Sequence, residues 1–598
     1  MRKYWLAGGG ALALAAGIAS LAPVFAQGAP ESLLPPGFGE APAPRPAPAT
    51  PAPAPGQPAP AAPAPAGPTP TLALDPALFA PAPMPVAEAL ELPPSARRPV
   101  DRVGLVAGFG PTTFGTASGK YLAGIMRRLD MPLASRWASI TVRRALISRV
   151  ETPAGIAPAD WIAERAWLLL RMGEADGARM LVQAVDVDRY NAKMYAVAAQ
   201  TALATSDPAG LCPLADGGAL RSKETIWPMA RAICAGLSGD GAIADVLMDQ
   251  ARRKTSDPRG IDVQLAEKVL GVNGSGARSV NIEWTGVNQL TSWRFGMASA
   301  LGVTVPADLM ATVGPQVAAW QARSPMLPAA DRIDAALIAA RLGVFSNAAL
   351  VDLYGQLADD GEELTADSKG GRLRACYVGD DDGARVAAMR WFWKGEGKEE
   401  GAAHDRFPQL ILTARAAAGV TPNSDFAGDV TDLVGSMMTA GLDRRAARWA
   451  PVIAGMSDEK ADAAWAILAV GAPEPVVDTR VPRVDAFAGR VEATDPHKAK
   501  MLIAALAGLG RLGGEDAPKL YSDHGVTFDL TSNWAQLIRR AAFDRQPGTV
   551  ALLVAMGMQR MEWRSVSPAL FYTMLRSLRE VGLDGEARMI AAEAMTRL

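Results

Sequence analysis

One phrase recurs three times along this chain: an apolar run, a glycine, an acidic turn, and then Ala-Arg with a second apolar run. It reads WLLLRMGEADGARMLVQAV from Trp167, LRACYVGDDDGARVAA from Leu373 and LREVGLDGEARMIAAEA from Leu578. Glycine commonly ends a helix, because it adopts the left-handed backbone that closes the last turn. An acidic residue beyond it favours a turn and a new helix start. Each phrase therefore predicts the corner between two antiparallel helices.

The composition and the apolar spacing favour helices through the rest of the chain. In PALFYTMLRSLREVG, from Pro568, apolar residues recur at intervals of three and four, which places them on one face of a helix. Ser567 is suited to cap that helix and Pro568 to begin it. Apolar residues make up 49% of the chain and aromatic residues 6%, with alanine dominant, so small side chains allow close helix packing. The predicted fold class is all-α.

The spacing of the predicted corners suggests repetition. Two looser corners, GDGAIADVLM and GLDRRAARWA, divide the intervals between the three phrases in a similar way, and the intervals are close to multiples of about 34 residues. We therefore predict an α-solenoid of helix hairpins, about 30 to 40 residues each, that curves into an arc or a ring. The predicted repeat corners are Gly173, Gly239, Gly379, Gly441 and Gly582.

Three segments give the chain a resemblance to the tetratricopeptide-like superfamily of exported bacterial helical-repeat proteins. They are WIAERAWLLLRMGEADGARMLVQAV, GLDRRAARWAPVI and VGLDGEARMIAAEAMTRL. Trp161 or Trp167 can take the first place of the family pattern W-x2-L-G-x2-Y, but the Leu-Gly-Tyr part is missing. The resemblance implies a concave surface that usually binds protein, and the family has no shared catalytic residues.

The first 26 residues are typical of a secretory signal peptide. Arg2 and Lys3 precede an uncharged stretch, and Val24-Phe25-Ala26 fits signal peptidase, with cleavage between Ala26 and Gln27. The mature protein is then periplasmic or secreted. The alternative is an uncleaved segment, since about 22 apolar residues can span a bilayer and would tether the protein to the inner membrane.

Three further regions follow the signal peptide. Residues 27–100 form a Pro/Ala-rich linker, in which proline removes amide donors and prevents regular structure, so we expect a disordered tether. Residues 101–275 and 276–598 are predicted to be two helical-repeat regions, separated at the glycine-rich stretch GVNGSGARSVNIEW. A second irregular stretch is expected at 478–490.

Two of the three cysteines are disulfide candidates. Cys212 and Cys234 are separated by 22 residues, and in an exported chain they can join neighbouring helices. The alternative is a pair of buried free thiols. Cys376 lies in an apolar helical pattern and is predicted to be a core residue.

The segment RWFWK contains a candidate partner surface. Trp391, Phe392 and Trp393 are adjacent, so a helix cannot point all three toward one core. One of them would then meet solvent, a partner protein or a sugar. The alternative is that they are buried at a junction between repeats.

Other candidate chemistry is weak. GFGPTTFGTASGK has Phe114 where a phosphate loop needs glycine, so we predict a flexible lead into the first helix. The consecutive acids of GDDDGAR do not alternate as a calcium loop requires. His404, His497 and His524 share no metal-ligand spacing. We predict no cofactor and no metal site.

These observations favour binding over catalysis. The formal net charge of −2 gives no indication of nucleic-acid binding, and no catalytic constellation is recognisable. We expect an exported scaffold or adaptor that binds a protein partner in the cell envelope through a helical groove. The alternative is an enzyme acting on peptidoglycan or another polysaccharide, with carboxylates inside a helical toroid. Cell-wall glycan is thus a second candidate partner, and membrane contact is expected only if the signal segment stays uncleaved.

Overall fold

The described part of the chain is about 66% helical and has almost no sheet, so the predicted all-α class is confirmed. The only sheet among the described residues pairs β1 (Arg102–Val103) with β2 (Val150–Glu151) in antiparallel register. The predicted signal peptide and most of the predicted linker lie outside the described residues. The computed structural model describes residues 97–272, 280–361, 363–395, 404–559 and 562–598.

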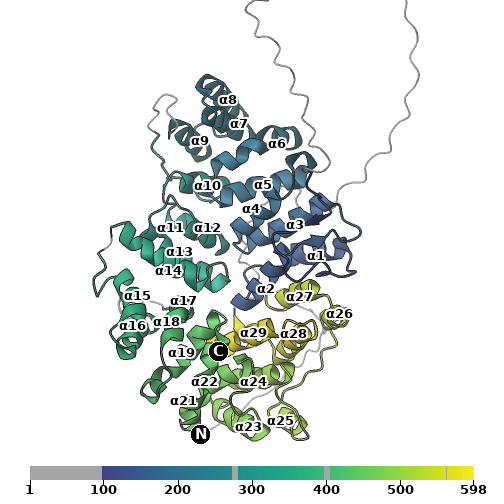
Figure 1. The fold of residues 1–598 in the computed structure, drawn as a ribbon. Coiled ribbons are helices and arrows are strands. Elements are labelled where there is room, and N and C mark those ends of the chain that lie inside the picture. The colour runs from purple at the N-terminus through teal and green to yellow at the C-terminus, as the bar shows by residue number, and fades with distance from the viewer. Residues whose placement is uncertain (1–96, 273–279, 362, 396–403, 560–561) are drawn as a thin grey trace, which may run out of the picture.

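The first group of helices extends from the body of the molecule to the end formed by α6, α7, α8 and α9 (Figure 1). Side-chain oxygens cap several of these helices; Ser135, for example, accepts a hydrogen bond from the Ala138 amide at the start of α2. The 3-10 segments η2 (Val187–Arg189) and η3 (Pro208–Leu214) connect α4, α5 and α6. The helices are α1 (Gly119–Arg128), α2 (Arg136–Ile147), α3 (Pro158–Arg171), α4 (Ala175–Gln183), α5 (Ala192–Ala204), α6 (Ala215–Arg221), α7 (Ile226–Leu237), α8 (Gly241–Lys254) and α9 (Ile261–Val272).

The second group begins at α10, which packs on both α5 and α9. The Trp293 indole donates to the Asp262 carbonyl at 3.1 Å, and a side chain at Gly296 would collide with the Leu203 backbone. One hydrophobic core therefore extends across the predicted boundary near residue 275, although residues 273–279 lie outside the described ranges. The helices are α10 (Ser292–Ala300), α11 (Ala307–Met310), α12 (Gln316–Ala322), α13 (Ala329–Leu342), α14 (Asn347–Asp359), α15 (Lys369–Val378) and α16 (Asp382–Lys394).

The third group returns toward the N-terminal helices. The stretch 478–490, predicted to be irregular, is mostly helical, because Pro482 stands in the first turn of α23, where a missing amide costs nothing. The elements are α17 (Arg406–Leu412), α18 (Ala414–Gly419), η4 (Ser424–Asp429), α19 (Val430–Thr439), α20 (Asp443–Ala447), α21 (Ala450–Ala454), α22 (Asp458–Gly471), α23 (Val481–Val491), α24 (Pro496–Gly508), α25 (Ala517–Asp523), α26 (Asn533–Phe543), α27 (Pro547–Gly557), η5 (Trp563–Ser565), α28 (Pro568–Glu580) and α29 (Asp584–Arg597).

All five predicted corner glycines stand between consecutive helices. Gly173, Gly239, Gly441 and Gly582 have positive φ angles between 71° and 88°. Gly379 differs, because it ends α15 with φ −56° and ψ 150°, a conformation open to other residues. At Gly173 the packing is also restrictive, since an added Cβ would lie 2.8 Å from the Ala319 Cβ. The sequence phrase thus corresponds to helix corners, but only four of them use left-handed backbone.

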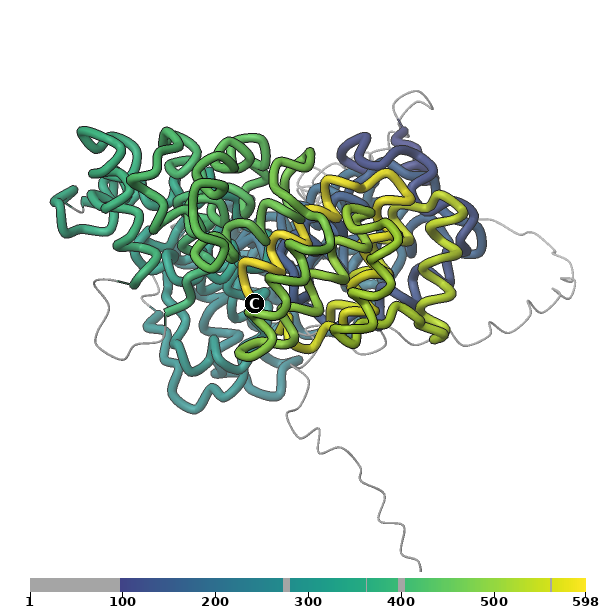
Figure 2. The backbone as a smooth tube through the Cα atoms, turned by 90° about the horizontal axis from the view of Figure 1, so that it is seen from below, coloured from purple at the N-terminus to yellow at the C-terminus, as the bar shows by residue number. Residues whose placement is uncertain are grey.

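The first and last helices meet, so the chain closes on itself. α2 packs against α27 and α29, and both figures place the C-terminal helices beside the N-terminal ones (Figures 1 and 2). The segment before α1 takes part: Phe114 is buried edge-on against Trp161, and the Gly548 amide donates to the Thr113 carbonyl at 2.8 Å. The prediction that this segment is flexible was wrong, because α27 covers it. A single regular superhelix is not confirmed.

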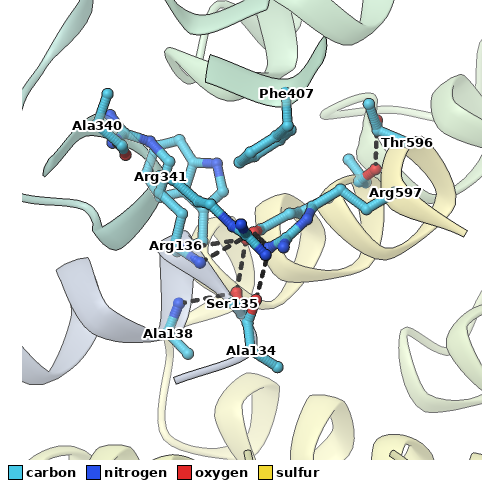
Figure 3. Close-up of polar contacts among 12 residues, drawn as sticks. Ala134, Ser135, Arg136, Ala138, Ala340, Arg341, Phe407, Thr596 and Arg597 are labelled. Atoms are coloured by element: carbon cyan, nitrogen blue, oxygen red, sulfur yellow. Dashed lines mark hydrogen bonds and ion pairs between the residues drawn. The ribbon is translucent and has the colours of Figure 1, made fainter. Parts of the chain in front are cut away.

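A buried polar cluster joins the ends of the chain to its middle (Figure 3). Glu593 on α29 accepts hydrogen bonds from the Ser135 hydroxyl at 2.6 Å and from the Arg136 amide at 2.9 Å. The Arg136 guanidinium donates to the carbonyls of Ala340 and Phe345, just before and after the end of α13. Three helices distant in sequence, α2, α13 and α29, are therefore fixed through two buried charged side chains.

Candidate binding surface

Exposed apolar side chains gather at the end of the molecule formed by α6 to α9. Leu220 is 84% exposed, Ile243 55%, Val246 57% and Val272 72%. Isolated exposed apolar residues are ordinary on protein surfaces, but a group at one end of a helical array indicates a contact surface. This end is the uppermost part of the molecule in Figure 1.

The packing of α8 explains why these side chains are uncovered. Only Ala244, Met248 and Ala251 are buried, and their spacing places them on one stripe, which faces the rest of the molecule. Ile243 lies to one side of this stripe and Val246 on the opposite side of the helix, and no described helix covers either of them. α8 therefore carries apolar side chains that its packing against the rest of the molecule does not bury.

A cavity of about 300 Å³ lies among α6, α7 and α8, at the same end of the molecule. Trp227 and Pro228 from α7 line it together with Leu247 and Lys254 from α8. Ile243 precedes Leu247 by one helical turn, so it stands on the same face of α8 as the cavity lining. We call the cavity, together with Ile243 and Val246, the seam groove.

The cavity lining carries more cations than anions. Lys223, Arg231 and Lys254 line it, against the single carboxylate of Glu224. Arg231 also pairs with the exposed Asp216 at 2.8 Å, whereas no ion pair of Lys223 or Lys254 is formed with any residue in the described ranges. Burial raises the pKa of Glu224, because desolvation disfavours its charged form.

The disulfide candidates lie next to this surface. The structure joins Cys212 in η3 to Cys234 in α7, with a Cα–Cα distance of 5.3 Å. A crosslink between these positions holds the α7 wall of the seam groove against the body of the molecule. It closes a loop of 22 residues, which is worth about 3 kcal/mol in the chain-entropy model. Cys376 is free and buried, in agreement with its predicted place in the core.

The structure buries two of the three adjacent aromatic residues, as the alternative interpretation of the sequence expected, and does not point all three toward one core. Phe392 and Trp393 are buried, and the Trp393 indole donates to the Thr413 hydroxyl at 2.8 Å. Trp391 is only half-buried and packs edge-on against Phe392, with ring centres 4.9 Å apart. Tyr354 of α14 packs edge-on against Phe392, and Thr413 at the end of α17 holds Trp393, so the three residues form no common exposed face.

The remaining predicted site residues carry no visible chemistry. The predicted cleavage site, Ala26 and Gln27, lies outside the described residues. His404 contacts the Trp393 carbonyl, and His524 stands between two carboxylates. In the part of the chain that the structure describes, no cluster of His, Cys, Asp or Glu side chains could hold a metal ion. Within the same ranges, no helix combines the length and apolar character that crossing a bilayer requires.

Sequence reasoning missed the seam groove. It interpreted GDGAIADVLM only as a helix corner, although the segment holds apolar residues on more than one helical face. Apolar residues beyond those needed for one buried face were the feature of the sequence that could have indicated an exposed apolar surface. Trp227, Lys223 and Lys254 carried no signal of their own, because their meeting depends on how α6, α7 and α8 pack.

Comparison with known proteins finds no matching family model, no similar curated protein and no similar solved structure. The resemblance to tetratricopeptide-like proteins therefore stays a prediction.

Proposed function

We propose that this chain is an exported scaffold or adaptor of the cell envelope, periplasmic or secreted, that binds another protein through the seam groove. The observation that carries the proposal is that Ile243, exposed on α8, lies one helical turn from Leu247 in the lining of the cavity. Apolar surface of this kind is stabilised when a partner removes it from water. The signal-like N-terminus and the Cys212–Cys234 disulfide support export, because disulfides persist in oxidising compartments.

The alternative, a polysaccharide-acting enzyme, receives less support from the cavity. Glycoside hydrolysis typically uses two carboxylates that flank the bond to be broken. Among the described residues, Glu224 is the only carboxylate that lines the cavity. Incubating the purified protein with peptidoglycan tests this alternative directly, and release of soluble sugar fragments would contradict the adaptor proposal.

Site-specific photocrosslinking in the producing cells tests the binding surface. A photoreactive residue at Ile243 should trap a discrete protein adduct, and the same residue at Phe543, which is 78% exposed on α26, should not. Val246→Asp introduces a charge into the apolar surface and should abolish the Ile243 adduct. Equal adducts at both positions, or an adduct that survives Val246→Asp, would count against the seam groove.

A further inference from the structure

We infer that the seam groove receives an acidic segment of a partner protein, with apolar side chains at one end and carboxylates at the other. This inference rests on the proposed function and specifies the chemistry of the partner.

The charged side chains that line the cavity indicate an acidic partner. Lys223 and Lys254 are exposed at one end of the groove, and no described residue pairs with either of them. Lys254 lies in the last turn of α8, where helix carbonyls favour a cation even when no ligand is bound. Two cations without ion-pair partners beside one half-buried carboxylate complement a ligand that brings additional negative charge.

The apolar side chains of α7 and α8 indicate that the partner also brings apolar residues. Ile243 stands near the corner at Gly239, at the opposite end of α8 from Lys254, and Val246 lies near the middle of the helix. Between the two ends of α8 lies the cavity, with Trp227 and Leu247 in its lining. A partner side chain such as leucine or phenylalanine would fill this cavity and exclude water from the indole ring.

One end of the groove is apolar and the other is positively charged, so a bound segment has a preferred orientation. Ile243 and Lys254 are eleven residues apart on one helix, so the groove is about 16 Å long at 1.5 Å per residue. Three turns of a partner helix or roughly five residues of an extended strand span that length. Apolar residues of the partner would contact Ile243 and Val246, and its carboxylates would reach Lys223 and Lys254.

Selection from a phage-displayed library of random 12-residue peptides, with the whole mature protein as the target, tests this inference. The selected peptides should be rich in Asp, Glu and large apolar residues. In fluorescence anisotropy, the double variant Lys223→Glu/Lys254→Glu should weaken their binding at least tenfold. The double variant Lys120→Glu/Lys460→Glu, which reverses two exposed lysines elsewhere, is the matched control and should leave binding unchanged. Circular dichroism checks that all variants fold.

The outcomes separate this inference from the proposed function. If Ile243→Asp abolishes peptide binding and the Lys223/Lys254 variant does not, the inference of an acidic partner is contradicted. The proposal that the groove binds protein then still stands. Selection of basic or uncharged peptides, or of none, also overturns it. Alginate, an anionic polysaccharide, is added as a competitor at the same concentration of negative charge as the unlabelled peptide. If alginate displaces the labelled peptide as strongly as the unlabelled peptide does, the inference of a protein partner is contradicted.

Discussion

The carboxylate of Glu593, in the last helix, accepts a hydrogen bond from the backbone amide of Arg136, at the start of α2, across 457 residues of sequence. The carboxylate thus acts as a cap supplied from the other end of the chain, next to the positive end of the α2 dipole. Arg597 completes the arrangement: it pairs with Glu593 at 2.9 Å and donates to the Ala134 carbonyl at 2.6 Å. One buried carboxylate therefore adds hydrogen bonds to the packing of α2 against α27 and α29 that closes the molecule.

Replacing Glu593 with alanine should destabilise the fold strongly. The change removes the acceptor of the Ser135 hydroxyl and the Arg136 amide and leaves the Arg597 guanidinium without its ion partner, for a cost of roughly 3 kcal/mol. Thermal melting followed by circular dichroism should show a clear decrease in melting temperature. Glu580→Gln is the control, because its pair with Arg576 is exposed and contributes less than about 1 kcal/mol. Equal melting temperatures for the two variants would contradict the role given to Glu593.

His524 makes the stability of the α23–α25 region depend on pH. Its Nδ1 lies 2.9 Å from Glu492 and its Nε2 lies 2.9 Å from Asp485. Carboxylates only accept, so both hydrogen bonds form together only when both ring nitrogens carry hydrogen and the ring is a cation. Burial alone lowers the pKa of His524, but the hydrogen bonds and charges of the two carboxylates outweigh it, and the pKa is raised.

The raised pKa of His524 sets the sign of the pH effect on stability. A histidine with a raised folded-state pKa contributes its full stabilisation below the unfolded value of about 6.5, and loses it as the pH rises through the higher folded value. The melting temperature of His524→Gln should therefore be below that of the wild type at pH 6 and approach it at alkaline pH. His497→Gln serves as the control. A difference that stays constant or grows between pH 6 and 9 would contradict this assignment.

The features that could be predicted from sequence are local ones. The corners at Gly173 and Gly582 were recognisable because chain reversal and helix termination are encoded within a few residues. The hydrogen bonds of Glu593 were not, because nothing near either end of the chain specifies a partner hundreds of residues away. Neither could the sequence decide which of Trp391 and Trp393 is buried, since helices elsewhere in the chain cover one of them.

The seam groove illustrates the same limit for the candidate site. Helical periodicity assigns apolar residues to a face of α8, but it does not say whether another helix covers that face. Ile243 has the pattern of a core residue and is exposed, because α8 lies at the end of the array. Burial at the ends of a helical array is decided by neighbours, and the sequence of α8 alone does not reveal that a neighbour is missing.

Export predicts a defined mature N-terminus. Signal peptidase should cleave after Ala26, so N-terminal sequencing of the protein from its own cells should begin at Gln27. Expression in the cytoplasm of a heterologous host, without an export signal, is the control for processing by other proteases. A protein that retains Met1 and fractionates with membranes would instead support the tethered alternative.

The three cysteines should differ in reactivity toward an alkylating agent. Cys212 and Cys234 are joined, and burial raises the pKa of the Cys376 thiol to about 12, which leaves almost no nucleophilic thiolate at neutral pH. Mass spectrometry of the iodoacetamide-treated protein should therefore show no label in the native state, one label after denaturation, and three after denaturation with reduction. The variant Cys376→Ala should lose only the label that denaturation exposes. Three labels without a reductant would mean that Cys212 and Cys234 are free thiols.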